Sequence, residues 1–404
     1  MSQPNPPVPV DLELLSDTGP LMSAAVDVRR RIHAHPEIGL DLPVTQELVA
    51  EELRRTGLEG RAGRACSSLV AVVEGEKEGP TTLLRADMDA LEMPEDTGLE
   101  FSSRLPGRMH ACGHDAHTAM LLGAARLLQS RRKDLNGRVV LMFQPGEEGH
   151  DGARVMLEEG LLEDHGPVSR AFAIHISSVL PSGWITCREG TIMASADEFH
   201  ITVTGQGGHA SMPHDAIDPV PAACQIVTSI QAMVTRAIPA FDPAVVTVST
   251  IHGGTATNVI PESVVLGGTI RAVSDRTRDQ VLSSLGELAS QVAAAHGCSA
   301  ALKLEAGSYP VTVNDALHAR HTLSVASSLI GADRVVAMPT PVMGAEDWSR
   351  VLRAVPGSMA FLGAAPPGVS RPAPNHSNLF VIDEAAMATG IAMYAAMALS
   401  SPAS

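Results

Sequence analysis

One short segment of the sequence gathers side chains that bind metal ions. Residues 109–117, Met-His-Ala-Cys-Gly-His-Asp-Ala-His, place a thiol, a carboxylate and three imidazoles close together in the chain. Thiolate and imidazole in combination suit zinc, cobalt, nickel or manganese. The same residues could instead begin an ordinary helix, with Asp115 as its cap and the histidines facing solvent. The segment alone leaves both interpretations open.

A pair of adjacent carboxylates follows an apolar strand. Val139–Phe143 is a continuous apolar run, and Gln-Pro-Gly-Glu-Glu-Gly at 144–149 comes directly after it. In open α/β sheets ligands bind outside the carboxyl ends of the strands, so Glu147 and Glu148 emerge where a site forms. Neighbouring side chains point in different directions, which lets one bind a metal while the other faces an attacking water. A solvated turn is the alternative for such a pair.

Three more segments place metal-compatible groups at similar positions. Arg-Ala-Asp-Met-Asp at 85–89 ends a strand that begins at Thr81, His175 ends the strand Arg170–Ile174, and Pro-Asn-His-Ser at 374–377 precedes the last helix. Any one of them could be structural. Several such groups at strand ends together predict a shared site.

The pattern around these residues predicts the elements that position them. Strand-like runs alternate with helices up to about residue 195, which indicates an α/β domain around a mainly parallel sheet. Helices are expected at 21–56, with an interruption at His35-Pro36, and at 117–131, 153–159, 316–330 and 384–399. Strands are expected at 68–73, 81–85, 138–144 and 170–174.

From about Ala196 the order changes to strand, helix, strand, strand, helix, strand. The expected elements are 197–205, 219–235, 245–251, 264–273, 276–295 and 300–305. This is the split βαβ order of a small ferredoxin-like domain. The sequence therefore predicts one α/β domain formed by residues 1–195 and 307–404, with residues 196–306 inserted into it.

Composition and charge exclude several classes of protein. The 404 residues are 45% apolar and 18% charged, which is typical of a globular chain long enough for two domains. The net charge of −16, from 45 acidic against 29 basic residues, disfavours nucleic acid as a partner. No apolar run approaches the roughly 20 residues of a membrane span, and five scattered cysteines are typical of a reducing compartment. We expect no membrane association and a cytoplasmic location.

Together these motifs resemble the M20 metallopeptidase superfamily, and within it the aminoacylases and amidohydrolases that include hippurate hydrolases and hydrolases of auxin–amino acid conjugates. The resemblance runs over nearly the whole chain. It rests on His-Ala-His-Pro-Glu-Ile-Gly at 33–39, Arg-Ala-Asp-Met-Asp-Ala-Leu at 85–91, the segment 109–125, Pro-Gly-Glu-Glu-Gly at 145–149, Gly-Gln-Gly-Gly-His-Ala-Ser at 205–211 and Asn-His-Ser at 375–377.

The resemblance implies a metal-dependent amidohydrolase that cuts the amide bond of N-acyl amino acids. Two divalent ions, drawn from zinc, manganese, nickel or cobalt, are expected, with Cys112 bridging them. Glu148 and His376 are implied to complete the ligands of one ion, and His114 and His175 those of the other. Glu147 is expected to activate the attacking water as general base and later to protonate the leaving amine.

Further roles follow from the same resemblance. His209, in the Gly-His-Ala-Ser motif, would stabilise the oxyanion from the inserted domain of a partner subunit, which implies a homodimer paired through that domain. Asn258 and Arg271 would bind the substrate carboxylate, with a turn residue and an ordinary salt bridge as their respective alternatives. In the wider superfamily a His-x-Asp motif supplies a ligand where this chain has Asp-Met-Asp at 87–89. Asp89 is therefore expected to accept the spare ring proton of a ligating histidine.

Three alternatives to this function stay open. A dipeptidase, or an N-acetyl-amino acid deacetylase of the diaminopimelate type, would use the same two ions. A catalytically silent metal-binding protein could share the fold, although no ligand is missing here. A thiol hydrolase with Cys112 as nucleophile is disfavoured because it leaves His114, Glu148 and His376 without a role.

Overall fold

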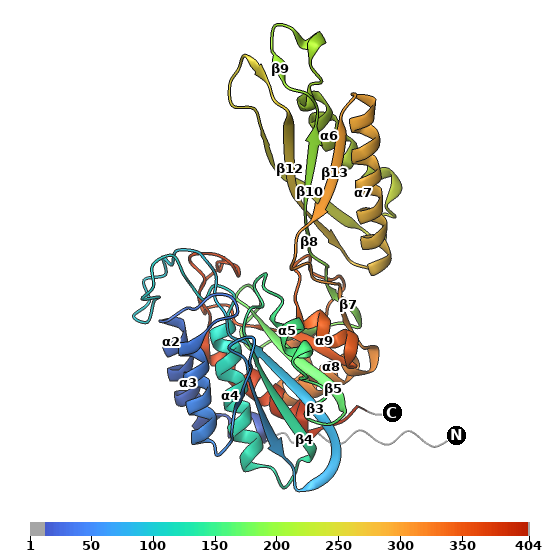
Figure 1. Cartoon of the computed structure of the whole chain (residues 1–404). Helices are drawn as coiled ribbons and strands as arrows, with labels where there is room; N and C mark the ends of the chain where they lie inside the picture. The colour runs from blue at the N-terminus through green and yellow to red at the C-terminus, as the bar shows by residue number, and fades with distance from the viewer. Residues whose placement is uncertain (1–12, 403–404) are drawn as a thin grey trace, which may run out of the picture. The chain divides into compact units, whose positions relative to one another are not determined.

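The computed structural model describes residues 13–402, which form two compact units (Figure 1). Within the described residues, unit 1 contains 13–192, Val313–Thr340 and 347–402, and unit 2 contains Met193–Thr312 and Pro341–Glu346. The interval 196–306, expected as an inserted domain, falls within unit 2. The first twelve residues of the expected 1–195 segment lie outside the described part of the chain.

Unit 1 is built on a large sheet. Its strands are β1 Arg61–Ala62, β2 Leu69–Glu74, β3 Lys77–Asp87, β4 Asn136–Gln144, β5 Val168–Ser177, β6 Ile185–Cys187, β15 Val335–Ala337 and β16 Gly357–Gly363. They pair in the order β1-β2-β4-β3-β5-β16-β6-β15. The four central strands β4, β3, β5 and β16 are parallel, whereas β2 pairs antiparallel with β4 and β6 with β16. The prediction of a mainly parallel sheet is confirmed. A separate two-stranded sheet pairs β7 Gly190–Met193 with β14 Thr312–Asn314.

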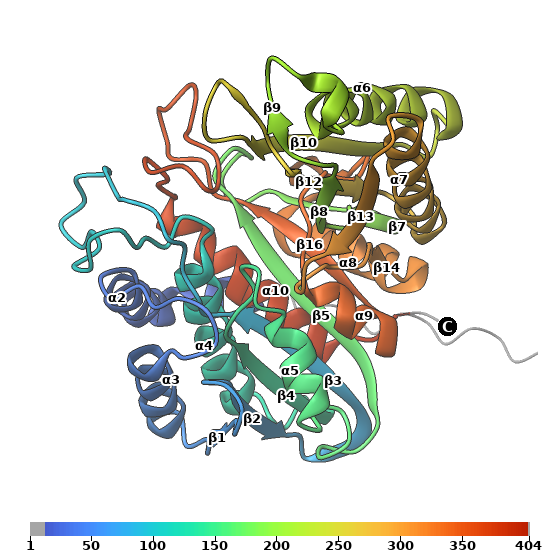
Figure 2. The ribbon, with the colours of Figure 1, turned by 45° about the horizontal axis from the view of Figure 1, so that its top comes forward.

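Helices cover both faces of the large sheet (Figure 2). They are α1 Leu14–Asp17, α2 Met22–His33, α3 Pro43–Arg55, α4 His114–Ser130, α5 Gly152–Glu158, α8 Ala316–Ile330, α9 Trp348–Ala354 and α10 Met387–Leu399. Helices α4, α10 and α8 pack side by side on one face, and α5 packs with α9 on the other. The helical stretch expected at 21–56 is two helices, α2 and α3, and it breaks near the His-Pro pair that predicted an interruption.

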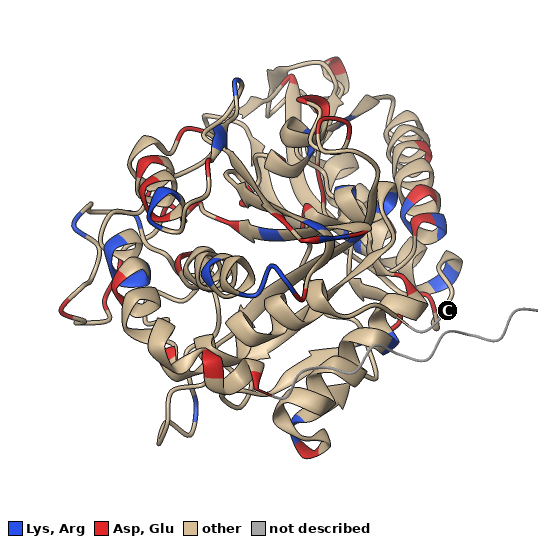
Figure 3. Cartoon of the chain, turned by 90° about the horizontal axis from the view of Figure 1, so that it is seen from below, with Lys and Arg blue, Asp and Glu red and all other residues tan. Residues whose placement is uncertain are grey.

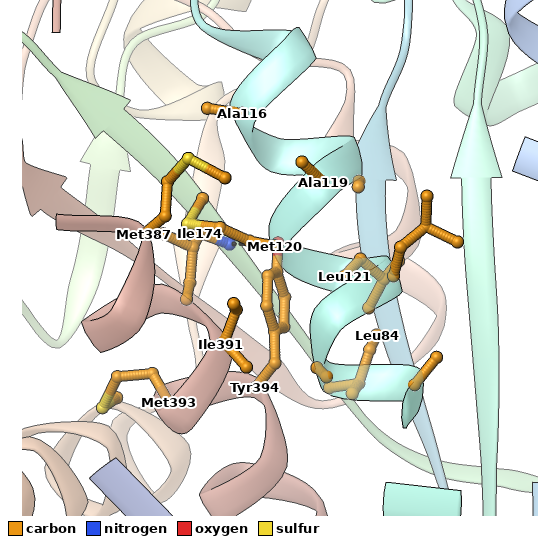
Figure 4. Close-up of a cluster of buried hydrophobic side chains, with 14 of the residues drawn as sticks. Leu84, Ala116, Ala119, Met120, Leu121, Ile174, Met387, Ile391, Met393 and Tyr394 are labelled. Atoms are coloured by element: carbon orange, nitrogen blue, oxygen red, sulfur yellow. Dashed lines mark hydrogen bonds between the residues drawn. The ribbon is translucent and has the colours of Figure 1, made fainter. Parts of the chain in front are cut away.

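Helix α10 is buried along almost its whole length, from Met387 to Ala398. A helix that is apolar on all sides belongs inside a protein. Helix α10 packs against α4 and the sheet, with Met120 of α4 and Tyr394 of α10 among the buried side chains there (Figure 4). A Cβ on Gly390 would lie 2.0 Å from the Sδ of Met120, so a larger residue here would displace the Met120 side chain. This packing fixes α4, the helix that carries the 109–117 segment at its start.

Unit 2 contains strands β8 Asp197–Thr204, β10 Ala244–Gly253, β12 Ser263–Ala272 and β13 Ser299–Leu304, with helices α6 Pro219–Ala237 and α7 Asp275–Ala295. The strands form an antiparallel sheet in the order β10-β12-β8-β13. The chain order of strands and helices is the split βαβ order expected from the sequence. A short ribbon pairs β9 Gly208–His209 with β11 Val259–Ile260.

Short 3₁₀ helices complete the described elements at Gly19–Leu21, Pro213–Asp215, Ala332–Arg334 and Glu384–Ala386.

Acidic and basic residues lie interspersed on the helices that are visible in Figure 3. Over residues 13–402, no helix is both long enough and apolar enough to span a membrane.

Candidate metal centre

The strand ends of unit 1 bring the chemistry-bearing residues to one edge of the sheet. Strands β3, β4 and β5 are parallel, so their carboxyl ends meet at the same edge. Asp89 follows β3, the Glu-Glu pair at 147–148 follows β4, and His175 lies near the end of β5. Gly113 precedes α4 with φ 94°, and a Cβ there would lie 2.2 Å from Cγ2 of Ile176. Only glycine allows the start of α4 to approach β5 this closely.

The first ligand group is Cys112, His114 and His175. The Sγ of Cys112 lies 3.4 Å from Nε2 of His175, and ligand atoms of all three residues lie within 4.8 Å of one another. Nδ1 of His114 and Nδ1 of His175 donate to the main-chain carbonyls of Asp89 and Ile176, both at 2.8 Å. Because each ring proton is used in this way, each histidine presents the lone pair of Nε2 to the cluster.

The second ligand group is Cys112, Glu148 and His376. Nε2 of His376 lies 3.3 Å from the Sγ of Cys112 and 3.2 Å from Oε1 of Glu148. His376 has a left-handed backbone with φ 67°, and its N–H donates to the carbonyl of Ala111 at 2.7 Å. The sulfur of Cys112 therefore belongs to both ligand groups.

The distances within both groups fit divalent ions. Ligand atoms about 2.0–2.3 Å from a tetrahedral ion lie roughly 3.3–3.8 Å from one another, and the sulfur–nitrogen separations here are 3.3 and 3.4 Å. Among the residues that the structure describes, the buried Nε2 of His114 has no hydrogen-bond partner. A buried polar atom without a partner is costly, and a cation would satisfy it. The donor set fits two divalent ions that share the sulfur.

The electrostatics of the cluster also favour a cation. Burial, helped by the charge of Glu148, raises the pKa of the Cys112 thiol. Hydrogen bonds to Cys112 and Glu148 raise the pKa of His376 to about 10. Both shifts have the negative charge of Glu148 among their causes, and that charge also favours a cation here. A divalent ion reverses the balance for the thiol, because a coordinated thiol binds as thiolate.

The turn that carries Glu147 and Glu148 is held by Asp89. The Asp89 carboxylate is 1% exposed, and its Oδ1 and Oδ2 accept the backbone N–H groups of Glu147 and Glu148, each at 2.9 Å. A carboxylate oxygen of Glu147 lies within 4.8 Å of the ligand atoms of His114 and Glu148. Asp89 does not make the contact expected from the sequence. Its main-chain carbonyl accepts the ring proton of His114, whereas its carboxylate Oδ1 lies 3.6 Å from Nδ1 of that histidine.

Comparison with known proteins identifies the family. Residues 83–400 match the model of peptidase family M20/M25/M40. The chain belongs to this family. Thermostable carboxypeptidase 1 of Saccharolobus solfataricus is 38% identical over 390 residues, which cover 96% of this chain and 98% of that protein. The IAA-amino acid hydrolase ILR1-like 4 of Arabidopsis thaliana is 41% identical over 377 residues, which cover 92% of this chain and 84% of that protein.

A solved structure of the same family has a similar fold. The crystal structure of Bacillus subtilis YXEP, described as a dinuclear metal binding peptidase from the M20 family, has a TM-score of 0.80 and 32% sequence identity to this chain. The match covers 94% of this chain and 98% of that one. The family resemblance inferred from the motifs is confirmed.

The other three expected site residues lie in unit 2. His209 is exposed, and its Nδ1 accepts the backbone N–H of Ser211 at 3.1 Å, so its ring proton is on Nε2. The main-chain carbonyl of the exposed Asn258 accepts the backbone N–H of Ala210 at 3.0 Å, which keeps Asn258 next to His209 on the β9–β11 ribbon. Arg271 is half-buried in β12 and forms no salt bridge with a carboxylate of residues 13–402.

Asn375 is a site residue that the sequence analysis missed. Its Nδ2 donates to the carbonyls of Cys112 and Ile176 at 3.0 and 3.1 Å. It thereby ties the turn that carries His376 to the segments that carry the other ligands. Its place directly before His376 was the one available signal.

Proposed function

We propose that this chain is a metal-dependent amidohydrolase that cuts the amide bond of N-acyl amino acids. The observation that carries the proposal is the pair of ligand groups that share the Cys112 sulfur beside Glu147. Cys112, His114 and His175 would hold one ion, and Cys112, Glu148 and His376 the other. The ions, when bound, lower the pKa of a water and polarise the substrate carbonyl.

Glu147 is proposed as the general base and acid. Its neighbour Glu148 is committed to a ligand group, whereas the Glu147 carboxylate, 5% exposed, lies beside the ligand atoms. There it would take a proton from the attacking water and deliver it to the leaving nitrogen, so that one residue performs both transfers. Asp89 fixes the position from which it does so.

Unit 2 is proposed to complete the site as a lid and dimerisation domain. Since the ring proton of His209 is on Nε2, this imidazole is a hydrogen-bond donor suited to a developing oxyanion. Arg271 and Asn258 would bind the carboxylate of the amino acid. We propose a homodimer in which His209 of one subunit serves the metal centre of its partner. A cytoplasmic location completes the proposal, in line with five free cysteines.

A second candidate uses the same site on a different amide. One relative is named a carboxypeptidase, which favours a dipeptidase or an N-acetyl-amino acid deacetylase, for example of diaminopimelate type. Both alternatives keep the ions, Glu147 and the carboxylate contacts. They differ only in what lies on the acyl side of the bond.

The proposal is tested with the purified protein and a substrate panel. N-acetyl, N-benzoyl and indoleacetyl amino acids and dipeptides are incubated with the enzyme, and the released amine is measured. We expect acyl amino acids to be cut faster than dipeptides, the activity to disappear with a chelator, and divalent metal to restore it. Release that persists unchanged in the chelator, or no release from any substrate after metal is restored, would contradict the proposal.

A further inference from the structure

His117 lies against the ligand groups and looks at first like another ligand. This residue lies on α4 and its imidazole is fully buried. The ring centroid is 5.0 Å from that of His175 and 5.5 Å from that of His114. One of its nitrogens lies within 4.8 Å of ligand atoms of Asp87 and His114. Proximity alone would count these three residues as a further metal site.

The hydrogen bonds of His117 exclude it as a ligand. Its Nε2 accepts the backbone N–H of Ile176 at 2.8 Å. A backbone N–H can only donate, so Nε2 carries no proton and its lone pair is occupied. The ring proton is therefore on Nδ1, which donates to Oδ1 of Asp87 at 2.5 Å. Neither nitrogen retains a lone pair for a metal ion.

Asp87 is itself fixed, so the orientation of His117 has no alternative. Oδ2 of Asp87 accepts Nη1 of Arg85 at 2.8 Å, and Nη2 of Arg85 donates to Oδ1 of Asp347 at 3.0 Å. All four side chains are buried. Turning the His117 ring or moving its proton would set an N–H against the N–H of Ile176 and a lone pair against a carboxylate.

Ile176 connects His117 to a ligand of the first group. Its N–H is held by His117, and its carbonyl accepts Nδ1 of His175 at 2.8 Å and Nδ2 of Asn375 at 3.1 Å. The main-chain N–H and carbonyl of Ile176 are thus hydrogen-bonded to side chains of α4 and of the 375–376 turn. They orient the His175 ring, whose Nε2 lies 3.4 Å from the Sγ of Cys112.

We propose that His117 is a positioning residue that holds the end of β5, through the N–H of Ile176, so that Nε2 of His175 stays directed at the shared metal site. The inference rests on the ligand assignment in the proposed function. The role depends on a hydrogen-bond acceptor at the ε position of this side chain.

Metal binding by three variants tests this role. Co²⁺ is titrated into the apoprotein, and the two dissociation constants and the absorption of bound Co²⁺ are recorded. In His117→Phe we expect one ion to bind about 10–100-fold more weakly, with the other near its wild-type affinity. His117→Gln keeps an acceptor at the ε position and should restore most of the lost affinity. His117→Asn ends one atom shorter and should behave like His117→Phe.

His175→Ala is the matched control, because it should lose the same ion. If His175→Ala still binds two ions, the ligand assignment fails, whatever the His117 variants do. If His175→Ala loses one ion but His117→Phe binds both as the wild type does, the positioning role is refuted. The positioning role is also refuted if His117→Gln loses as much metal affinity as His117→Asn. Should His117→Phe not fold, the comparison of His117→Gln with His117→Asn decides.

Discussion

Asp89→Asn tests how the turn at Glu147 and Glu148 is positioned. The substitution is nearly isosteric, but it replaces one accepting oxygen with an NH₂ group that faces a backbone N–H. One hydrogen bond to a charged group is lost, worth roughly 1.5–3 kcal/mol, and one buried N–H is left unpaired at a cost of about 1–3 kcal/mol. The turn then has to move away from its wild-type position.

The sum of these terms, roughly 2.5–6 kcal/mol, sets the expected loss of activity. If the whole penalty falls on the placement of Glu147 in the transition state, kcat/KM decreases by about 10²–10⁴, since about 1.4 kcal/mol corresponds to a factor of ten. The assay is amine release from an N-acyl amino acid, with metal content measured on the same sample. Glu148 shares the turn, so weaker binding of one ion should accompany the loss.

Glu37→Gln is the control for a general loss of stability. Glu37 is 9% exposed, and its two oxygens accept the backbone N–H groups of Val44 and Thr45 at 3.1 and 2.8 Å, an arrangement like that of Asp89 but at the start of α3. It should lower the free energy of unfolding and leave kcat/KM almost unchanged. If Asp89→Asn keeps wild-type kcat/KM, or if Glu37→Gln lowers kcat/KM equally, the reasoning is refuted.

Two further predictions concern proton transfer and pH. Glu147→Gln should retain both ions, measured as metal content, and lower kcat by roughly 10²–10⁴; turnover at the wild-type rate would contradict its role. Burial alone would lower the pKa of His33, but hydrogen bonds to Asp115 and Glu95 outweigh it and raise the pKa to about 9. This stabilisation is fully present below about pH 6.5 and is lost as the pH rises through about 9. Between pH 6 and pH 9.5 the free energy of unfolding, measured with denaturant, should therefore fall by up to about 3 kcal/mol more in the wild type than in His33→Gln. Equal decreases in the two proteins would rule the effect out.

Most of the scaffold could be predicted because its elements have local signals. Helix α7 and strand β8 alternate buried and exposed residues with the period of a helix or a strand. Strand β16 was missed although it lies in the centre of the sheet. Its seven residues are all buried, and such a short apolar run has no period that separates strand from helix. Its identity comes from parallel pairing with β5, a contact between residues far apart in the chain.

The site was predictable to the extent that it depends on side-chain chemistry. Thiol, imidazole and carboxylate groups at strand ends indicate a metal centre from their types alone. The contacts of Asp89 and Asn375 could not be predicted in the same way, because both bind main-chain groups. Every residue has such groups, so only the fold selects which of them meet a given side chain.

The choice among the three imidazoles of the 109–117 segment shows the same limit. His110 is fully buried, burial lowers its pKa to about 3, and neither of its ring nitrogens has a hydrogen-bond partner within the described chain. His117 has both nitrogens occupied, whereas His114 gives its ring proton to the Asp89 carbonyl and keeps Nε2 free. Residue type and spacing do not distinguish the three. The hydrogen-bond partners of the ring nitrogens do, and since those of His114 and His117 lie on β5, at the end of β3 or just after it, the packing of α4 on the sheet determines which imidazole nitrogen is left for a metal ion.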